Sequence, residues 1–132
     1  MDGSDSSMKA VKKAISIAKK FNIPLLSFYV AEEIETPKLL KSEKINQLLY
    51  REEEEKAQKI LNEVQKFGNE AGIKINTMVI HGTPYEEIIN EVHKDDLIIM
   101  GRKGHSSFER LFLGSVSERV IHHVDASVMI VK

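Results

Sequence analysis

Glycines and a serine with phosphate-binding chemistry are concentrated in one stretch of the chain. Gly101 ends the apolar run Leu97-Ile98-Ile99-Met100, Gly104 follows after two residues, and Gly114-Ser115 follows after nine more. Glycine lets the backbone approach a bound group without a Cβ in the way, and a helix that begins here would direct free N–H groups and its positive dipole end at an anion. The stretch predicts a phosphate-binding loop, although turns alone would also explain isolated glycines.

The spacing of these residues (Gly, two residues, Gly, nine residues, Gly-Ser) resembles the nucleotide-binding signature of the universal stress protein family. The segments 100–104, 111–116 and 126–131 are similar to the same family, and the resemblance extends over nearly the whole chain. Within that family, the glycine spacing resembles the subfamily that binds ATP. The resemblance implies ATP, or AMP or ADP, as the ligand, with Mg²⁺ or Mn²⁺ carried by the nucleotide, and a nucleotide-dependent regulatory or stress-response role.

The resemblance also implies a set of binding residues. Val30, at the end of a strand, would meet adenine through its backbone, and Asp2 would contact the nucleotide or its metal. Asp2 could equally be a helix cap, and Ser117 could equally be an ordinary first-turn helix residue. The expected nucleotide-binding residues are Asp2, Val30, Met100, Gly101, Arg102, Gly104, His105, Gly114, Ser115, Val116 and Ser117.

No catalytic residue is predicted. The chain has neither a Gly-x-x-x-x-Gly-Lys-Ser/Thr loop nor a Gly-x-Gly-x-x-Gly motif, and no nucleophile stands beside a base at a recognised spacing. Binding is therefore better supported than turnover, with slow ATP hydrolysis still open. Two alternatives remain: an ATP-dependent enzyme of the nucleotide alpha hydrolase-like group, and a dimerising stress module that binds no nucleotide.

Composition excludes several other classes of protein. With 132 residues and 42% hydrophobic content the chain has the size of one domain, and its net charge of −1 is unlike that of a general nucleic-acid binder. It has no cysteine, and none of its five histidines stands in a His-Glu-x-x-His motif, so we expect no protein metal site. No apolar run approaches the roughly 18 residues of a membrane span, and we expect a cytoplasmic protein without a membrane partner.

Helical and strand patterns alternate along the chain. The periodicity predicts helices at about 4–21 and 45–67, a third after the Thr83-Pro84 cap with Ile88, Ile89 and Val92 buried, and a last one after Gly114. Strands are predicted at 23–30, 73–80, 97–100 and 128–131, and segment 31–42 is expected to be a loop. Gly68 and Gly72 should bracket the end of the long helix, whose acidic run 51–56 is expected to be a solvated face. This alternation predicts an α/β fold with a doubly wound, open parallel sheet and helices on both faces.

One strand of the family pattern is missing. Family members begin with a short apolar strand that runs into Asp-Gly-Ser and lies in the middle of the strand order 3-2-1-4-5, whereas this chain starts at Met1-Asp2-Gly3-Ser4. Met1 could be an internal methionine of a longer reading frame, or a swapped or repacked strand could fill the gap. We expect one universal stress protein domain, 1–132, truncated at its N-terminus relative to the family, and a homodimer formed through the bare apolar strand 127–132.

Overall fold

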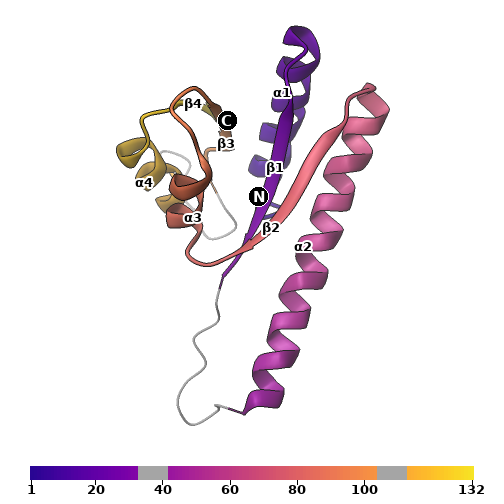
Figure 1. The fold of residues 1–132 in the computed structure, drawn as a ribbon, viewed down its shortest axis with the longest axis vertical. Coiled ribbons are helices and arrows are strands. Elements are labelled where there is room, and N and C mark those ends of the chain that lie inside the picture. Colours follow the sequence, from indigo (N-terminus) through magenta and orange to yellow (C-terminus); the bar gives the residue numbers. More distant parts are fainter. Residues whose placement is uncertain (33–41, 104–112) are drawn as a thin grey trace.

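The computed structural model describes residues 1–32, 42–103 and 113–132, in which helices and strands alternate (Figure 1). Part of the expected 31–42 loop thus lies outside the described residues. None of the described helices is long and apolar enough to cross a membrane. The elements are α1 (Asp5–Phe21), β1 (Leu25–Ala31), α2 (Glu43–Ala71), β2 (Ile75–His81), α3 (Pro84–Glu91), β3 (Leu97–Gly101), α4 (Ser115–His123) and β4 (Ser127–Val131).

Helix α1 is capped at both ends. The Ser4 hydroxyl accepts a hydrogen bond from the backbone N–H of Ser7, which satisfies one of the donors left over at a helix start. At the other end Asn22 adopts a left-handed conformation with φ of 52°, and its N–H donates to the carbonyl of Ala18. The predicted helix at about 4–21 is confirmed.

Helix α2 is longer than predicted and contributes buried residues to both core clusters. It runs for 29 residues, and its buried side chains pack against α1 and the β1–β2 pair in two clusters. Gly72 ends the helix in a left-handed conformation, but the expectation that Gly68 also marks the end is wrong. Gly68 lies inside α2, where a Cβ would come within 2.7 Å of the Ile75 side chain. This glycine therefore permits close packing of α2 on β2.

The strands form two separate parallel pairs. β1 pairs with β2, with Leu25 opposite Ile75, and β3 pairs with β4, with Leu97 opposite Ser127. No described strand joins β1 to β3, so the expected parallel sheet is present as two halves. Figure 1 shows β1–β2 beside α2, and β3–β4 apart from them with α3 and α4. We call the space between β1 and β3 the strand gap; it lies where the missing central strand was expected.

The N-terminal segment and α1 connect the two halves. The amino group of Met1 donates to the carbonyl of Phe28 in β1 at 2.8 Å, and burial lowers the pKa of this ammonium. Three residues further on, the Ser4 hydroxyl contacts the carbonyl of Lys103, two residues beyond β3. Helix α1 packs against β1 on one side of the gap and against β3 and β4 on the other. Side-chain packing and a few polar contacts thus replace strand pairing in the middle of the fold.

Helix α3 departs from its prediction. Thr83 precedes the helix as expected, but within the described residues its side chain makes no capping hydrogen bond. None of the helix residues is buried, and Ile88, Ile89 and Val92 are only half-covered. The physical reason is that α3 packs on α4 and on part of β1, beside an interrupted sheet that offers it no continuous apolar surface.

Candidate functional site

The two ends of the predicted phosphate loop meet at the end of β3. The N–H of Arg102 donates to the carbonyl of Val131 at 3.0 Å, which extends the β3–β4 pairing by one step. The carbonyl of Arg102 accepts from the N–H of Gly114 at 2.8 Å. The chain therefore leaves β3 and returns to the same place to start α4, which brings the first and third motif glycines together.

Gly101 is needed by the packing of α1. A Cβ at this position would lie 2.6 Å from the backbone carbon of Ser6, closer than real side chains approach. Its φ is not positive, so no unusual backbone angle requires glycine here. Sequence reasoning assigned Gly101 to ligand approach; the described contacts show that it also lets the first turn of α1 rest on the end of β3.

The start of α4 exposes backbone donors. Gly114 is its N-cap, with extended φ and ψ of −68° and 151°. The N–H that we expected Gly114 to offer to phosphate instead donates to Arg102. The N–H groups of Ser115 and Val116 make no hydrogen bond within the described residues, as is usual for a first helical turn. These two groups are the backbone donors of the predicted cradle.

Ser117 has a structural contact. Its side chain is buried, and its hydroxyl donates to the carbonyl of Gly101 at 3.0 Å. The hydroxyl therefore fastens α4 to the end of β3. Of the two roles that the sequence left open for Ser117, the described contact corresponds to the structural one.

Asp2 and Ser4 join the N-terminal segment to the loop. Asp2 Oδ1 accepts from the Ser4 N–H at 3.0 Å and from the Ser4 hydroxyl at 2.7 Å. The same hydroxyl lies 3.4 Å from the carbonyl of Lys103, whose N–H donates to Ser6 Oγ at 3.3 Å. Burial alone would raise the pKa of Asp2, but the hydrogen bonds from Ser4 and Ser7 and the nearby amino terminus lower it below its ordinary value. Asp2 is thus held as a carboxylate beside the loop.

Sequence reasoning did not identify Ser4 and Ser6 as part of the site. Their partner in the loop, Lys103, is 97 to 99 positions away along the chain. No local pattern signals a contact over that distance. The serine-rich start of α1 is the one feature that could have drawn attention to them.

Val30 presents its backbone toward the strand gap. The Ala31 carbonyl accepts from Gly82, beyond β2, whereas the Phe28 carbonyl accepts from Met1 on the opposite side of β1. Because backbone groups of successive residues in a strand point to opposite sides, the N–H and C=O of Val30 point the same way as those of Phe28. Neither group is hydrogen-bonded within the described residues. One donor and one acceptor are thus free at the carboxyl end of β1.

The remaining predicted residues are divided between the end of β3 and the part of the chain that is not described. Met100 is half-buried in β3 opposite Ile130, and Arg102 is half-buried directly after the strand. Gly104 and His105 lie outside the described residues. The structure therefore brings Asp2, Gly101, Arg102, Gly114 and Ser117 into one connected group, with Val30 across the strand gap.

Two tyrosines fasten the acidic part of α2 to the sheet. The buried Tyr29 donates to Glu53 at 3.1 Å, and burial, together with this carboxylate, raises the pKa of Tyr29. Tyr50 stacks on His81 with ring centroids 4.8 Å apart, and His81 Nε2 lies 2.5 Å from Glu54. The acidic run was predicted to be a solvated face; Glu53 and Glu54 instead bond to strand residues.

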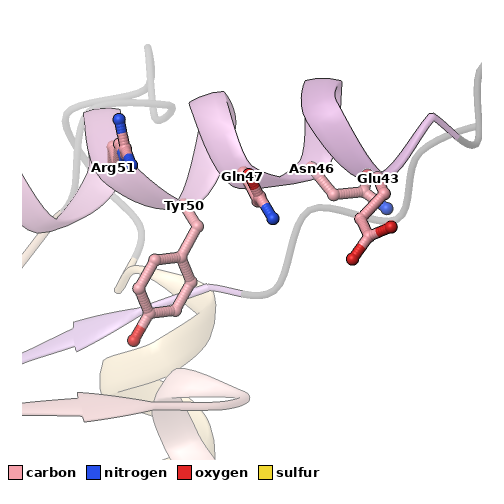
Figure 2. Close-up of a pocket in the computed structure, with 5 residues that line it drawn as sticks. All are labelled: Glu43, Asn46, Gln47, Tyr50 and Arg51. Carbon is pink, nitrogen blue, oxygen red and sulfur yellow. The ribbon is translucent and has the colours of Figure 1, made fainter.

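An open hollow of about 500 Å³ lies along the first half of α2. Figure 2 shows Tyr50 extending from the helix toward the strands, with Asn46 and Glu43 one and two turns away. Its described lining residues are Glu43, Asn46, Gln47, Tyr50 and Arg51. None of these belongs to the predicted nucleotide set, so the hollow is separate from the connected group at β3. Among the described residues, no three His, Cys, Asp or Glu side chains are arranged to hold a metal ion.

Comparison with known proteins decides the family. The model of the universal stress protein family matches residues 1–132. The chain belongs to this family. It is 40% identical to a universal stress protein of Methanocaldococcus jannaschii over 99% of this chain and 78% of that protein. The alternating α/β arrangement of the described elements is the fold of these proteins.

Solved structures agree with this assignment. The universal stress protein UspA from Lactobacillus plantarum superposes with a TM-score of 0.87 and 25% identity, over 100% of this chain and 93% of that one. A universal stress protein in complex with cAMP superposes with a TM-score of 0.70 and 30% identity, over 100% and 92% of the two chains. Relatives of this chain thus include one seen with an adenine nucleotide.

We predict that Asp2→Ala lowers the free energy of unfolding near neutral pH by about 1 kcal/mol, since the hydrogen bonds from Ser4 are lost. A carboxylate whose pKa is lowered in the folded state stabilises the fold above its unfolded-state value of 3.8, and this contribution disappears as the pH falls through the lower folded value. The difference in free energy of unfolding between the parent and Asp2→Ala should therefore become smaller at acid pH. Chemical denaturation across this pH range measures it.

The matched control is Glu63→Ala, which removes an exposed carboxylate from α2. It should leave the stability of the protein within about 0.5 kcal/mol of the parent. If the free energies of unfolding of Asp2→Ala and the parent differ by the same amount at neutral and at acid pH, the role given to the carboxylate is contradicted.

Proposed function

We propose that residues 1–132 form one universal stress protein domain that binds ATP, or AMP or ADP, at the carboxyl edge of its strands and acts as a nucleotide-dependent regulatory module. The observation that carries this proposal is the convergence of unpaired donors at that edge. The N–H groups of Ser115 and Val116 open α4 beside Arg102, and Asp2 is held next to the same turn. A phosphate group suits such a helix start because of both the free donors and the helix dipole.

The base would lie across the strand gap from the phosphates. The free N–H and C=O of Val30 offer one donor and one acceptor, the pair of groups that the edge of adenine can match. The known cAMP complex of a relative supports an adenine nucleotide as the ligand class. The site therefore uses backbone groups from one half of the fold for the base and from the other half for the phosphates.

The charge of the phosphates requires partners. Arg102 and Lys103 stand at the start of the loop and supply positive charge. Asp2 would face a Mg²⁺ or Mn²⁺ ion that arrives with the nucleotide, since such ions keep several waters and bind largely through phosphate oxygens. Binding is the activity that these donors and charges support, since phosphoryl transfer also needs a nucleophile held in line by a positioned base.

Gly114→Val tests the phosphate site. Its extended backbone angles are open to any residue, so the variant should fold, with a capping loss of about 1 kcal/mol or less. The valine side chain would stand at the helix start, where phosphate should bind. We expect ATP affinity, measured by isothermal titration calorimetry, to fall at least tenfold.

Ser127→Val serves as the control because it adds the same side chain at an exposed position of β4, at the opposite end from Gly101. It should leave ATP affinity unchanged. If a folded Gly114→Val protein binds ATP as tightly as the parent, the assignment of the phosphate site is wrong, and if the parent binds no adenine nucleotide, the proposed function is wrong.

We also propose that the protein forms a homodimer through β4. The Val131 carbonyl accepts from Arg102, so the backbone groups of Val128 and Ile130 point away from β3. The outer edge of β4 is apolar and lacks proline and inward charge, and such edges tend to pair. Two copies joined there would form a closed, two-fold pair.

Val128→Pro should convert the dimer to a monomer, because proline removes an outward N–H of β4 while leaving the hydrogen bonds to β3 intact. Sedimentation velocity at tens of micromolar measures the change. A parent protein that sediments as a monomer, or a variant that remains dimeric, would contradict this interface.

A further inference from the structure

The first half of α2 adds nothing to the two core clusters. The buried residues of α2 all lie at Ala57 or later, and neither cluster includes a residue of the segment 43–55, which we call the arm. At about 1.5 Å per residue the arm is roughly 20 Å long. Figure 1 shows it reaching past the carboxyl ends of β1 and β2. The arm therefore presents a helix surface outside the body of the fold.

One side of the arm is joined to the sheet. Tyr50 and Glu54 both contact His81 at the end of β2, and Figure 2 shows Tyr50 pointing toward the strands. Leu48 and Glu52 each stand two positions before one of these residues, which at 3.6 residues per turn is about half a turn around the helix. Leu48 and Glu52 thus lie on the side of the arm that faces away from β2.

The outward side of the arm carries an exposed leucine between two opposite charges. Leu48 is 53% exposed, and Ile45 in the preceding turn is 38% exposed. Lys44 stands four residues before Leu48 and Glu52 four residues after it, and both are exposed. Neither charge forms an ion pair within the described residues. We call Lys44, Leu48 and Glu52 the outward row.

The outward row is complementary to a second copy of itself in one orientation. In an antiparallel pair of arms with the two-fold axis at Leu48, Lys44 of each copy lies opposite Glu52 of the other, because both residues are equally far from Leu48. Such a pair forms two identical ion pairs on either side of two apposed leucines. A parallel pair would instead place Lys44 opposite Lys44 and Glu52 opposite Glu52, and like-charge repulsion disfavours that arrangement.

We propose that the arm is a self-association surface whose occupant is the arm of a second copy, packed antiparallel about Leu48. The contact is isologous, because the same surface serves both copies. A single helix row buries less than the roughly 800 Å² per partner of a standard interface, so we expect reversible association at high protein concentration. This inference goes beyond nucleotide binding and the pairing of β4, since the arm shares no residue with either.

Disulfide crosslinking of the full chain tests the proposal. The chain has no cysteine, so Leu48→Cys introduces a single thiol at the proposed axis. Gln47→Cys is the matched control, because Gln47 is an exposed neighbour on the side of the arm that lines the hollow. Under mild oxidation we expect Leu48→Cys to form disulfide-linked dimers at least tenfold faster than Gln47→Cys. Equal rates would show random collision, and no crosslinking would leave the outward row to a different protein; either result overturns the proposal.

Charge exchange in the Leu48→Cys protein tests the antiparallel orientation. Adding either Lys44→Glu or Glu52→Lys should slow crosslinking at least tenfold, because each change places like charges opposite each other. When the two charge variants are mixed, they should crosslink to one another at about the rate of Leu48→Cys alone, since both ion pairs form again. A mixture that stays slow would overturn the proposed arrangement.

The same mixture in the Gln47→Cys protein is the control for net charge. The two charge variants differ in net charge, so they could attract each other without any contact between arms. We expect the Gln47→Cys mixture to stay at least tenfold slower than the Leu48→Cys mixture. Equal rates in the two mixtures would show attraction between net charges and overturn the proposal.

Discussion

Hydrogen bonding between strands stops in the middle of this fold, and the packing of α1 and the N-terminal segment takes its place. In a continuous parallel sheet every interior strand pairs on both edges. Here β1 and β3 each pair on one edge, and the two halves are joined by Met1 on β1, by Ser4 and Ser6 on Lys103, and by α1 against both halves. The arrangement of the two halves relative to each other therefore depends on these contacts.

The contacts that join the two halves also constrain the residues of the candidate site. Gly101 must lack a Cβ because the first turn of α1 rests on it, and the hydroxyl of Ser117 closes the other side of that glycine. Asp2 is held by Ser4, which also contacts the loop. Groups with direct roles in the proposed phosphate site are therefore fixed by contacts that also hold the fold together, so changes in one should be felt in the other.

Local patterns in the sequence were sufficient for most of the fold. The periodicity of α1, the run of four apolar residues in β3 and the alternation of strand and helix predicted the elements and the α/β class. The glycine spacing identified the family. The position of the strand gap also followed from the missing apolar run. These features depend on neighbouring residues or on spacing, which a sequence displays directly.

Contacts between distant residues were not predictable in this way. The partners of Ser4 and Ser6 lie almost a hundred positions away, and the use of the Gly114 N–H by Arg102 depends on how the loop closes. The poor burial of α3 follows from the interrupted sheet beneath it, although its own periodicity is that of a buried face. Periodicity describes what a helix could bury, and the neighbouring strands determine what it does bury.

In the proposed site the base lies on β1 and the phosphates lie at β3 and α4, so the site spans both halves of the fold. Amide hydrogen exchange with and without saturating ATP tests it directly, because Tyr29 reports on the β1–β2 pair and Met100 on the β3–β4 pair. A ligand that binds only when both halves are in place should slow exchange at both amides by a similar factor. Slowing confined to one pair would show that the nucleotide binds one half alone and would contradict this account.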